Sequence, residues 1–146
     1  MPISERQLKV KKSTIPGAGK GLFTKEFIPK GTRIIEYKGR ITTWKDVLEG
    51  KHFNGYVYFI NRNHVIDAMR RKSALARYAN DARGHSKIKG VVNNCDYVVE
   101  NKRVFIESKK DIEAGEELLV SYGNDYWKAV AEYKKFLEAE SKKGKK

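Results

Sequence analysis

The sequence predicts a mainly β fold of small sheets, with short helices and one amphipathic C-terminal helix. Short runs of apolar and β-branched residues recur along the chain, and turns rich in Gly, Pro and Asn separate them. A sustained helical spacing of apolar residues occurs near the end, at Tyr126, Val130, Tyr133 and Leu137. Many turns with few helices are typical of a compact β-rich domain.

The first half of the chain predicts two strands and one short helix. Leu8 and Val10 alternate with lysines, which indicates a half-buried strand, and a glycine-rich turn over 14–21 follows it. A second strand is expected over 32–37. Thr43 with Asp46 three residues later is typical of a helix N-cap, so we expect a short helix that stops at Gly50.

The second half predicts two hairpins and an irregular segment. Residues 56–60 and 65–68 read as one hairpin, and 98–100 and 103–106 read as the other, with Asn101-Lys102 as its turn. Residues 73–84 are Ala-rich at first and then polar, which predicts one helical turn running into irregular backbone.

Residues 25–35 resemble residues 109–119 at a constant offset. Two copies are too few for a repeat array. We therefore expect two similar turn-strand units inside one fold.

The length of 146 residues suits one domain with its own core. We expect an N-terminal arm over 1–8, the folded domain over 9–126, the C-terminal helix over 127–140 and a Lys-rich tail over 141–146. No apolar run is long enough to span a membrane, and the first residues lack the apolar stretch of a signal peptide. These features predict an intracellular protein in the cytoplasm, with the nucleus or nucleoid as alternatives.

Composition argues against a metal site and for anionic partners. The single cysteine, Cys95, excludes an internal disulfide and a cysteine-based zinc cluster, and the three histidines are not at metal-ligand spacing. The formal charge of +13 attracts nucleic acid or another polyanion, although a solvated Lys-rich surface is the commoner cause of such a composition.

Several short motifs follow one another in a fixed order. Read alone, Tyr122 before Gly123 is more typical of a core tyrosine than of a catalytic one, and the glycine-rich stretch is more typical of a plain loop. The series is Gly17-Ala18-Gly19-Lys20-Gly21-Leu22-Phe23, Glu36-Tyr37-Lys38-Gly39, Val65-Ile66-Asp67-Ala68, Ala76-Arg77-Tyr78-Ala79-Asn80, Gly115-Glu116-Glu117-Leu118 and Ser121-Tyr122-Gly123. From about Lys9 to Tyr126, this series resembles the SET domain of protein lysine methyltransferases.

The resemblance implies a β-clip fold of small sheets, with a pseudoknot between the segment after Asn80 and the C-terminal segment. It implies S-adenosylmethionine on one face, the substrate lysine on the other, and a narrow channel between them. The residues that it places at the cofactor are Ala18, Gly19, Lys20, Asn80 and Asp81. Those that it places at catalysis or in the channel are Tyr122, Tyr37, Val120 and one or both of Tyr56 and Tyr58.

Two departures from the family pattern stand out. Asn80-Asp81-Ala82-Arg83 replaces the usual Asn-His-Ser-Cys, and an insertion precedes Asn93-Asn94-Cys95. The cysteines of a zinc-binding segment after the SET domain are also missing, so we expect no metal and expect the C-terminal helix to close the channel. Trp127 on this helix either covers the adenine of the cofactor or packs in the core.

The chemistry suits these residues. A free lysine has a pKa of about 10.4, so presenting it neutral near pH 7.5 costs roughly 4 kcal/mol, and an apolar channel beside a sulfonium lowers that pKa. The tyrosine oxygen of Tyr122 would orient the amine rather than remove a proton. When the whole motif series is considered, a functional role for Tyr122 is favoured over a purely structural one.

We therefore expect S-adenosylmethionine-dependent methyl transfer to a lysine of a protein, with a histone or a basic DNA-associated protein as partner and a weak attraction to nucleic acid. The alternative is a catalytically weak SET-like module that binds a lysine-bearing peptide or nucleic acid. Asp67, Glu100, Glu107, Glu116 and Glu117 are candidates for an acidic substrate groove.

Overall fold

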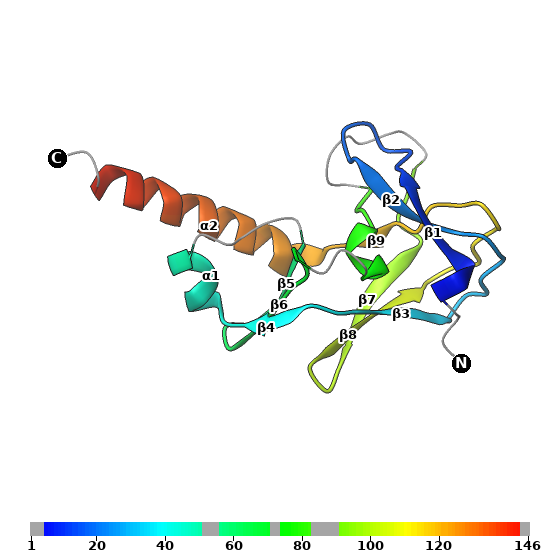
Figure 1. Cartoon of the computed structure of the whole chain (residues 1–146), viewed down its shortest axis with the longest axis horizontal. Coiled ribbons are helices and arrows are strands. Elements are labelled where there is room, and N and C mark those ends of the chain that lie inside the picture. The colour runs from blue at the N-terminus through cyan, green and yellow to red at the C-terminus, as the bar shows by residue number, and fades with distance from the viewer. Residues whose placement is uncertain (1–4, 51–55, 71–73, 83–90, 144–146) are drawn as a thin grey trace. The chain divides into compact units, whose positions relative to one another are not determined.

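The computed structural model describes residues 5–50, 56–70, 74–82 and 91–143, apart from the side chains of 123–127 and 143 (Figure 1). The chain divides into two compact units. Unit 1 consists of Met1–Lys38 and Arg71–Ser121, and unit 2 of Gly39–Arg70 and Tyr122–Lys146. The small sheets and the C-terminal helix confirm the predicted fold class.

Unit 1 contains a two-stranded ribbon and a four-stranded sheet. A short 3₁₀ turn, η1 (Glu5–Gln7), precedes the ribbon of β1 (Leu8–Lys12) and β2 (Lys20–Thr24), which pair antiparallel. The sheet has the order β3-β8-β7-β9, and a second 3₁₀ turn, η2, lies outside it. The bounds are β3 (Arg33–Tyr37), η2 (Leu75–Tyr78), β7 (Cys95–Glu100), β8 (Arg103–Ser108) and β9 (Val120–Ser121).

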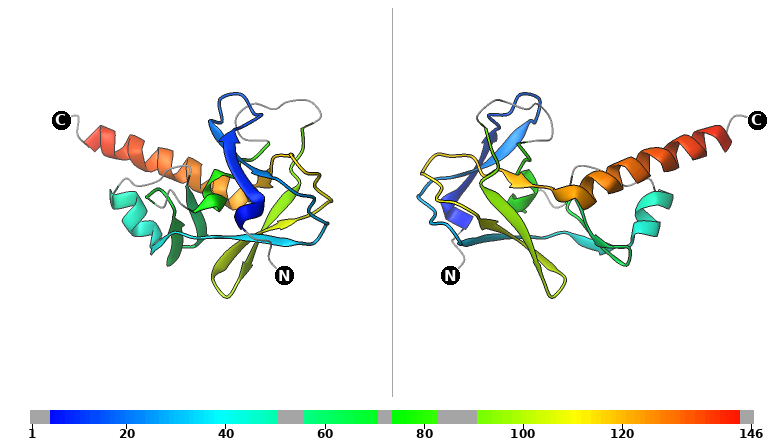
Figure 2. Two further views of the ribbon diagram at one scale, coloured as in Figure 1. Left: turned by 45° about the vertical axis from the view of Figure 1, so that its right-hand side comes forward. Right: turned by 180° about the vertical axis from the view of Figure 1, so that it is seen from behind.

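The predicted second hairpin is β7 and β8, which Figure 2 shows as a long antiparallel pair. Its turn is Asn101-Lys102, and both residues have positive φ, 52° and 63°. Two successive left-handed residues are typical of a type I′ turn, whose twist matches that of the strands. The single helical turn predicted in the Ala-rich stretch is η2.

The two similar turn-strand segments, 25–35 and 109–119, are related by a local two-fold arrangement. Ile28 and Ile112 occupy equivalent positions in the two segments and exchange both backbone hydrogen bonds, each 2.8 Å. Gly31 and Gly115 are also equivalent, and both have positive φ, 83° and 91°. Their N–H groups donate to Ser108 O and Thr24 O respectively, again 2.8 Å each. The sequence echo therefore corresponds to a structural pair in the core of unit 1.

The C-terminal part of unit 1 lies among segments from across the chain. Leu118 N donates to Leu22 O at 2.7 Å, and Leu119 forms a parallel bridge with Asn80. β9 then pairs parallel with β7. The two segments that the resemblance joins in a pseudoknot are thus in contact. The large side chains that are completely buried in this unit include Ile15, Leu22, Ile28, Ile34, Val104, Ile106, Ile112, Leu118 and Val120.

Unit 2 contains a three-stranded sheet and two helices. The sheet order is β4-β6-β5, with β4 (Arg40–Thr42), β5 (Val57–Asn61) and β6 (His64–Asp67). The hairpin predicted here is β5 and β6. The helices are α1 (Trp44–Gly50) and α2 (Gly123–Lys143). None of the helices in the described part of the chain is long and apolar enough to cross a membrane.

Aromatic and apolar side chains from both helices and the sheet form the core of unit 2. Trp44 is 1% exposed and packs edge-to-face on Phe59, with ring centroids 5.4 Å apart. Val47, Val57, Val65 and Ala129 complete the buried cluster. The Trp44 indole N–H donates to the Glu132 carboxylate on α2, and Arg62 binds the same carboxylate at 2.9 Å. The predicted cap is present, because Asp46 N donates to Thr43 Oγ1 at 3.1 Å.

Candidate functional site

The glycine-rich turn between β1 and β2 is a closed loop with an exposed backbone. Ser13 N donates to Gly19 O at 2.8 Å and fixes the base of the loop. Gly17 and Gly19 have φ of 81° and 73°, a conformation that side-chain-bearing residues rarely adopt. A Cβ built at either position meets nothing within 4 Å. The loop backbone therefore borders open space in which a ligand could approach closely.

A buried carboxylate accepts hydrogen bonds from the first residues of this loop. Glu117 is 6% exposed, and its Oε1 accepts hydrogen bonds from Thr14 N at 2.9 Å and Thr14 Oγ1 at 2.6 Å. Its Oε2 accepts from Ser13 Oγ at 2.7 Å. These hydrogen bonds replace water around the buried charge. Of the acidic-groove candidates, Glu117 thus lies in the interior, whereas its neighbour Glu116 is exposed.

The position of Glu117 explains a glycine of the first motif. A Cβ on Gly21 would lie 2.2 Å from Glu117 Oε2, far inside contact distance. The missing side chain at Gly21 makes room for the carboxylate, and the carboxylate fixes the loop that starts at Ser13. The motifs around Gly21 and Glu117 are therefore parts of one local structure.

Asn80 connects the glycine-rich loop to the strand that precedes Tyr122. Its Nδ2 donates to Lys20 O at 3.0 Å, and its backbone O accepts from Val120 N at 2.8 Å. Asn80 is 8% exposed, and its Oδ1 receives no hydrogen bond from the described residues. The structure thus brings together Lys20, Asn80 and Val120, three of the predicted site residues.

Two asparagines that the sequence analysis did not assign support this segment. Asn93 Nδ2 donates to Asp81 Oδ1 at 3.0 Å, and its Oδ1 accepts from Ala82 N at 2.8 Å. Asn94 Oδ1 accepts from Leu119 N, and its Nδ2 donates to Glu117 O, both at 2.9 Å. The available signal was two adjacent asparagines before a strand, because asparagine side chains can replace missing backbone partners. Asp81, the second residue of the altered motif, is therefore buried and hydrogen-bonded.

Tyr37 and Val120 are core residues of unit 1. Tyr37 is 4% exposed on β3 and packs edge-to-face on Tyr97 of β7, with centroids 6.0 Å apart. Val120 is completely buried opposite Cys95. Burial raises the pKa of the Cys95 thiol to about 12, so this cysteine stays protonated and is not a nucleophile at neutral pH.

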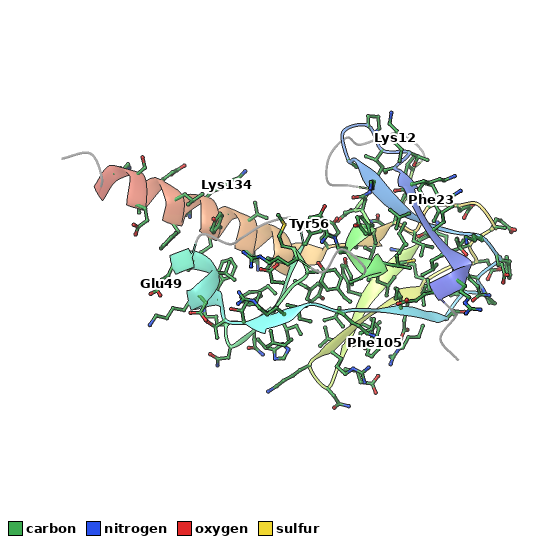
Figure 3. All side chains as sticks on the ribbon, viewed as in Figure 1. Lys12, Phe23, Glu49, Tyr56, Phe105 and Lys134 are labelled. Atoms are coloured by element: carbon green, nitrogen blue, oxygen red, sulfur yellow. The ribbon has the colours of Figure 1, made fainter. Side chains whose placement is uncertain are left out.

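The remaining predicted tyrosines belong to unit 2. Tyr56 O accepts from Ala68 N at 3.0 Å, and Tyr58 is paired with Ile66 in the sheet. Tyr122 directly follows β9 and is partly buried. All three tyrosines are at intermediate exposure, and Figure 3 labels Tyr56. The Trp127 side chain lies outside the described residues, so its proposed contact with the cofactor stays a prediction.

Two other acidic candidates are engaged by an arginine. Arg33 Nη1 binds Glu100 and its Nε binds Glu107, each at 2.8 Å, and the hydrogen bond to Glu100 contributes most to raising the Arg33 pKa. Across the described residues, no group of three His, Cys, Asp or Glu side chains could hold a metal ion.

Comparisons with known proteins agree with this geometry. The family model of the SET domain matches residues 19–123, which includes the glycine-rich loop, Asn80, Glu117 and Tyr122. The chain belongs to the SET domain family. The chain is 26% identical over 128 residues to "N-lysine methyltransferase KMT5A" of Xenopus tropicalis and 28% identical over 138 residues to "Histone-lysine N-methyltransferase set-1" of Caenorhabditis elegans. These matches cover 79% and 88% of this chain.

The chain spans only part of the length of these relatives, because the matches cover 36% of the frog protein and 55% of the nematode protein. The fold is also similar to that of the methyltransferase domain of human PR domain-containing protein 2. That match has a TM-score of 0.60 and 25% identity, and it covers 82% of this chain and 78% of the human one. At the level of the family, these similarities support methyl transfer to lysine.

Proposed function

We propose that this SET domain transfers a methyl group from S-adenosylmethionine to the side-chain amine of a lysine in a protein. The observation that supports it best is the position of Asn80, which connects the glycine-rich loop to β9 immediately before Tyr122. The name of the nematode relative favours a histone as the substrate.

The residues of unit 1 fit the cofactor. The exposed loop backbone at Gly17 and Gly19 borders open space, and Asn80 Oδ1 is an acceptor without a donor among the described residues. An amide oxygen at this position suits the ammonium of an amino acid. Ala18, Gly19 and Lys20 would contribute backbone groups, and Asp81 would contribute its main chain. When bound, S-adenosylmethionine would supply the methyl group as a sulfonium.

The remaining work of the residues is to present a neutral amine in the correct direction. Deprotonating a lysine at pH 7.5 costs roughly 4 kcal/mol, and apolar or aromatic walls lower this cost because they disfavour the ammonium. We assign Tyr37, Val120, Tyr56 and Tyr58 to these walls. The Tyr122 oxygen would accept a hydrogen bond from the amine and fix its orientation, a contribution of positioning rather than of strong base catalysis.

Calorimetric titration with S-adenosylmethionine tests the cofactor site. We expect binding by the wild type and loss of binding by Asn80→Ala, because the substitution removes both the Oδ1 acceptor and the bond to Lys20 O. Asn63→Ala is the matched control, since Asn63 is exposed in unit 2. Thermal unfolding of each variant shows whether it folds. A wild type that does not bind, or a folded Asn80→Ala that binds equally well, would contradict the assignment.

Transfer of labelled methyl groups to a core histone mixture tests catalysis separately. We expect Tyr122→Phe to keep cofactor binding while the rate falls by about two orders of magnitude, because the amine is no longer held in the reactive orientation. Tyr133→Phe, a change within the packed core of unit 2, should keep the rate. Cofactor binding without methyl transfer to histones or to a basic DNA-associated protein would instead support the alternative of a catalytically weak binding module.

A further inference from the structure

The β1-β2 ribbon has an unusual concentration of positive charge. From Arg6 to Lys25 the sequence contains six basic residues and no acidic residue. Five of the six are lysines with exposed side chains on or beside the ribbon. They are Lys9, Lys11, Lys12, Lys20 and Lys25.

These lysines are not neutralised within the protein. None of the five forms an ion pair with a residue that the structure describes. Lys11 Nζ lies 4.4 Å from the centroid of the Phe23 ring, a contact that orients the ammonium but leaves its charge in place. Acidic groups on the flanking segments are Glu5, which precedes Arg6 in η1, and Glu26, which binds Gln7 at the far end of the ribbon; Glu117 is buried under the loop.

One pair of lysines is placed against the usual rules for sheets. Lys12 and Lys20 are directly opposite one another at the loop end of the ribbon, where Figure 3 labels Lys12. Like charges in directly opposed positions destabilise a strand pair. Lysines on an edge strand often serve to block aggregation, but that purpose does not require two of them in opposition. An anion bound across both would remove this repulsion.

We propose that the β1-β2 ribbon is a docking surface for the phosphate backbone of duplex DNA. Alternate residues of a strand point to opposite faces, so Lys9 and Lys11 lie on one face of β1, whereas the opposed pair Lys12 and Lys20 lies on the other. Duplex DNA offers one negative charge per about 1.7 Å of axis, so the long lysine side chains on the two faces of this narrow ribbon would meet several phosphates at once. A single-stranded partner fits less well, because it requires exposed aromatic side chains for stacking, and Phe23, the one aromatic side chain in β1 and β2, is 3% exposed.

This surface is distinct from the reaction proposed above, although Lys20 contributes to both through different atoms. Its backbone carbonyl binds Asn80, whereas its side chain is exposed on the ribbon. Docking of this kind reads no bases and is sequence-independent. It would hold the enzyme near proteins that coat DNA, where a basic enzyme would otherwise repel a basic substrate.

Fluorescence anisotropy with a labelled duplex of about two helical turns tests the proposal in the absence of cofactor. The variant is Lys9→Glu/Lys11→Glu/Lys12→Glu, which keeps the edge charged but reverses its sign. The matched control is Lys134→Glu/Lys135→Glu/Lys142→Glu on the exposed face of α2. Each triple variant lowers the formal charge from +13 to +7, because each substitution removes two charge units.

We expect salt-dependent binding by the wild type, with a slope of log K against log salt of about −3 to −4 for four phosphate contacts. The ribbon variant should bind at least about tenfold more weakly at low salt, with a slope smaller by about 3, while the α2 variant should change little. Equal losses in both variants would show a net-charge effect and overturn the proposal. So would absence of wild-type binding, or tighter binding of the single strand. If the Glu variant fails to fold by circular dichroism, the Lys→Gln triple at the same positions replaces it with the same expected direction.

Discussion

Glu117 and Gly21 show how two residues from different motifs depend on one another. The Glu117 carboxylate satisfies two hydroxyls and one backbone N–H, and it occupies the volume where a Gly21 side chain would lie. Removing the carboxylate leaves buried donors without their acceptor, which typically costs about 1–3 kcal/mol. Adding a methyl group at Gly21 forces the carboxylate out of the same position.

A double-mutant cycle measures this dependence. Gly21→Ala and Glu117→Ala should each lower the free energy of unfolding in urea by about 1–3 kcal/mol, and the double variant should lose clearly less than their sum. The reason is that the clash disappears once Glu117 is truncated. Glu116→Ala, next to Glu117 but exposed, is the control and should change stability by less than about 0.5 kcal/mol. Additive losses would mean that the two residues do not share this volume.

The different burial of Glu116 and Glu117 could not be predicted from the local sequence. Both belong to the same acidic pair, and local patterns do not tell which carboxylate turns inward. That choice depends on Ser13 and Thr14, more than one hundred residues earlier in the chain. The roles of Asn93 and Asn94 were also not predictable from local sequence, because their hydrogen-bond partners lie in other segments.

At the scale of elements, the β7-β8 turn stores conformational strain. Lys102 has φ of 63°, a region in which a lysine is disfavoured and a glycine is not. Lys102→Gly should therefore stabilise the protein by about 0.5–1 kcal/mol in urea unfolding, since Asn-Gly is a preferred type I′ sequence. Lys110→Gly is the control. It is an exposed lysine outside the positive-φ set and should have the opposite sign. A destabilised Lys102→Gly would contradict this account of the turn.

Elements with a local signal were predictable and others were not. The β5-β6 and β7-β8 hairpins, the cap at Thr43 and the C-terminal helix all follow from short-range spacing and turn chemistry. β4 was missed because its three residues are mostly exposed, so no apolar alternation reveals it. β2 was not expected as a strand, because its residues are buried on both faces and follow a glycine-rich loop. β2 and β4 form through pairing and packing with segments that are distant in the sequence.

At the scale of the whole molecule, one buried thiol couples stability to alkaline pH. The Cys95 pKa rises from 9.0 to about 12, chiefly through burial. Its contribution is complete below pH 9 and is lost as the pH rises toward 12, because only the unfolded state then releases the proton. Between pH 7 and 10, the wild type should lose about 1 kcal/mol more than Cys95→Ala in urea unfolding. The comparison with Cys95→Ala removes the contributions of all other titrating groups and the pH-independent cost of the cavity. Parallel pH profiles of the two proteins would refute the coupling.

The local two-fold in unit 1 connects the sequence echo to the site. Ile28 and Ile112 join the two turn-strand segments, and each segment is followed by a tyrosine that we propose for the site. The first continues into β3 with Tyr37, and the second into β9 and then Tyr122. Each of the two similar local sequences is thus followed closely by one of the assigned tyrosines.

The contact between Ser13 and Glu117 also matters during synthesis. These residues are 104 positions apart. A ribosome that adds about 5–20 residues per second needs roughly 5–20 s to produce the second after the first. During that interval the nascent chain displays Leu22 and the loop donors before Leu118 and Glu117 exist to cover them. Production of this protein in the cell is therefore expected to depend on protection of the growing chain until its last strand has emerged.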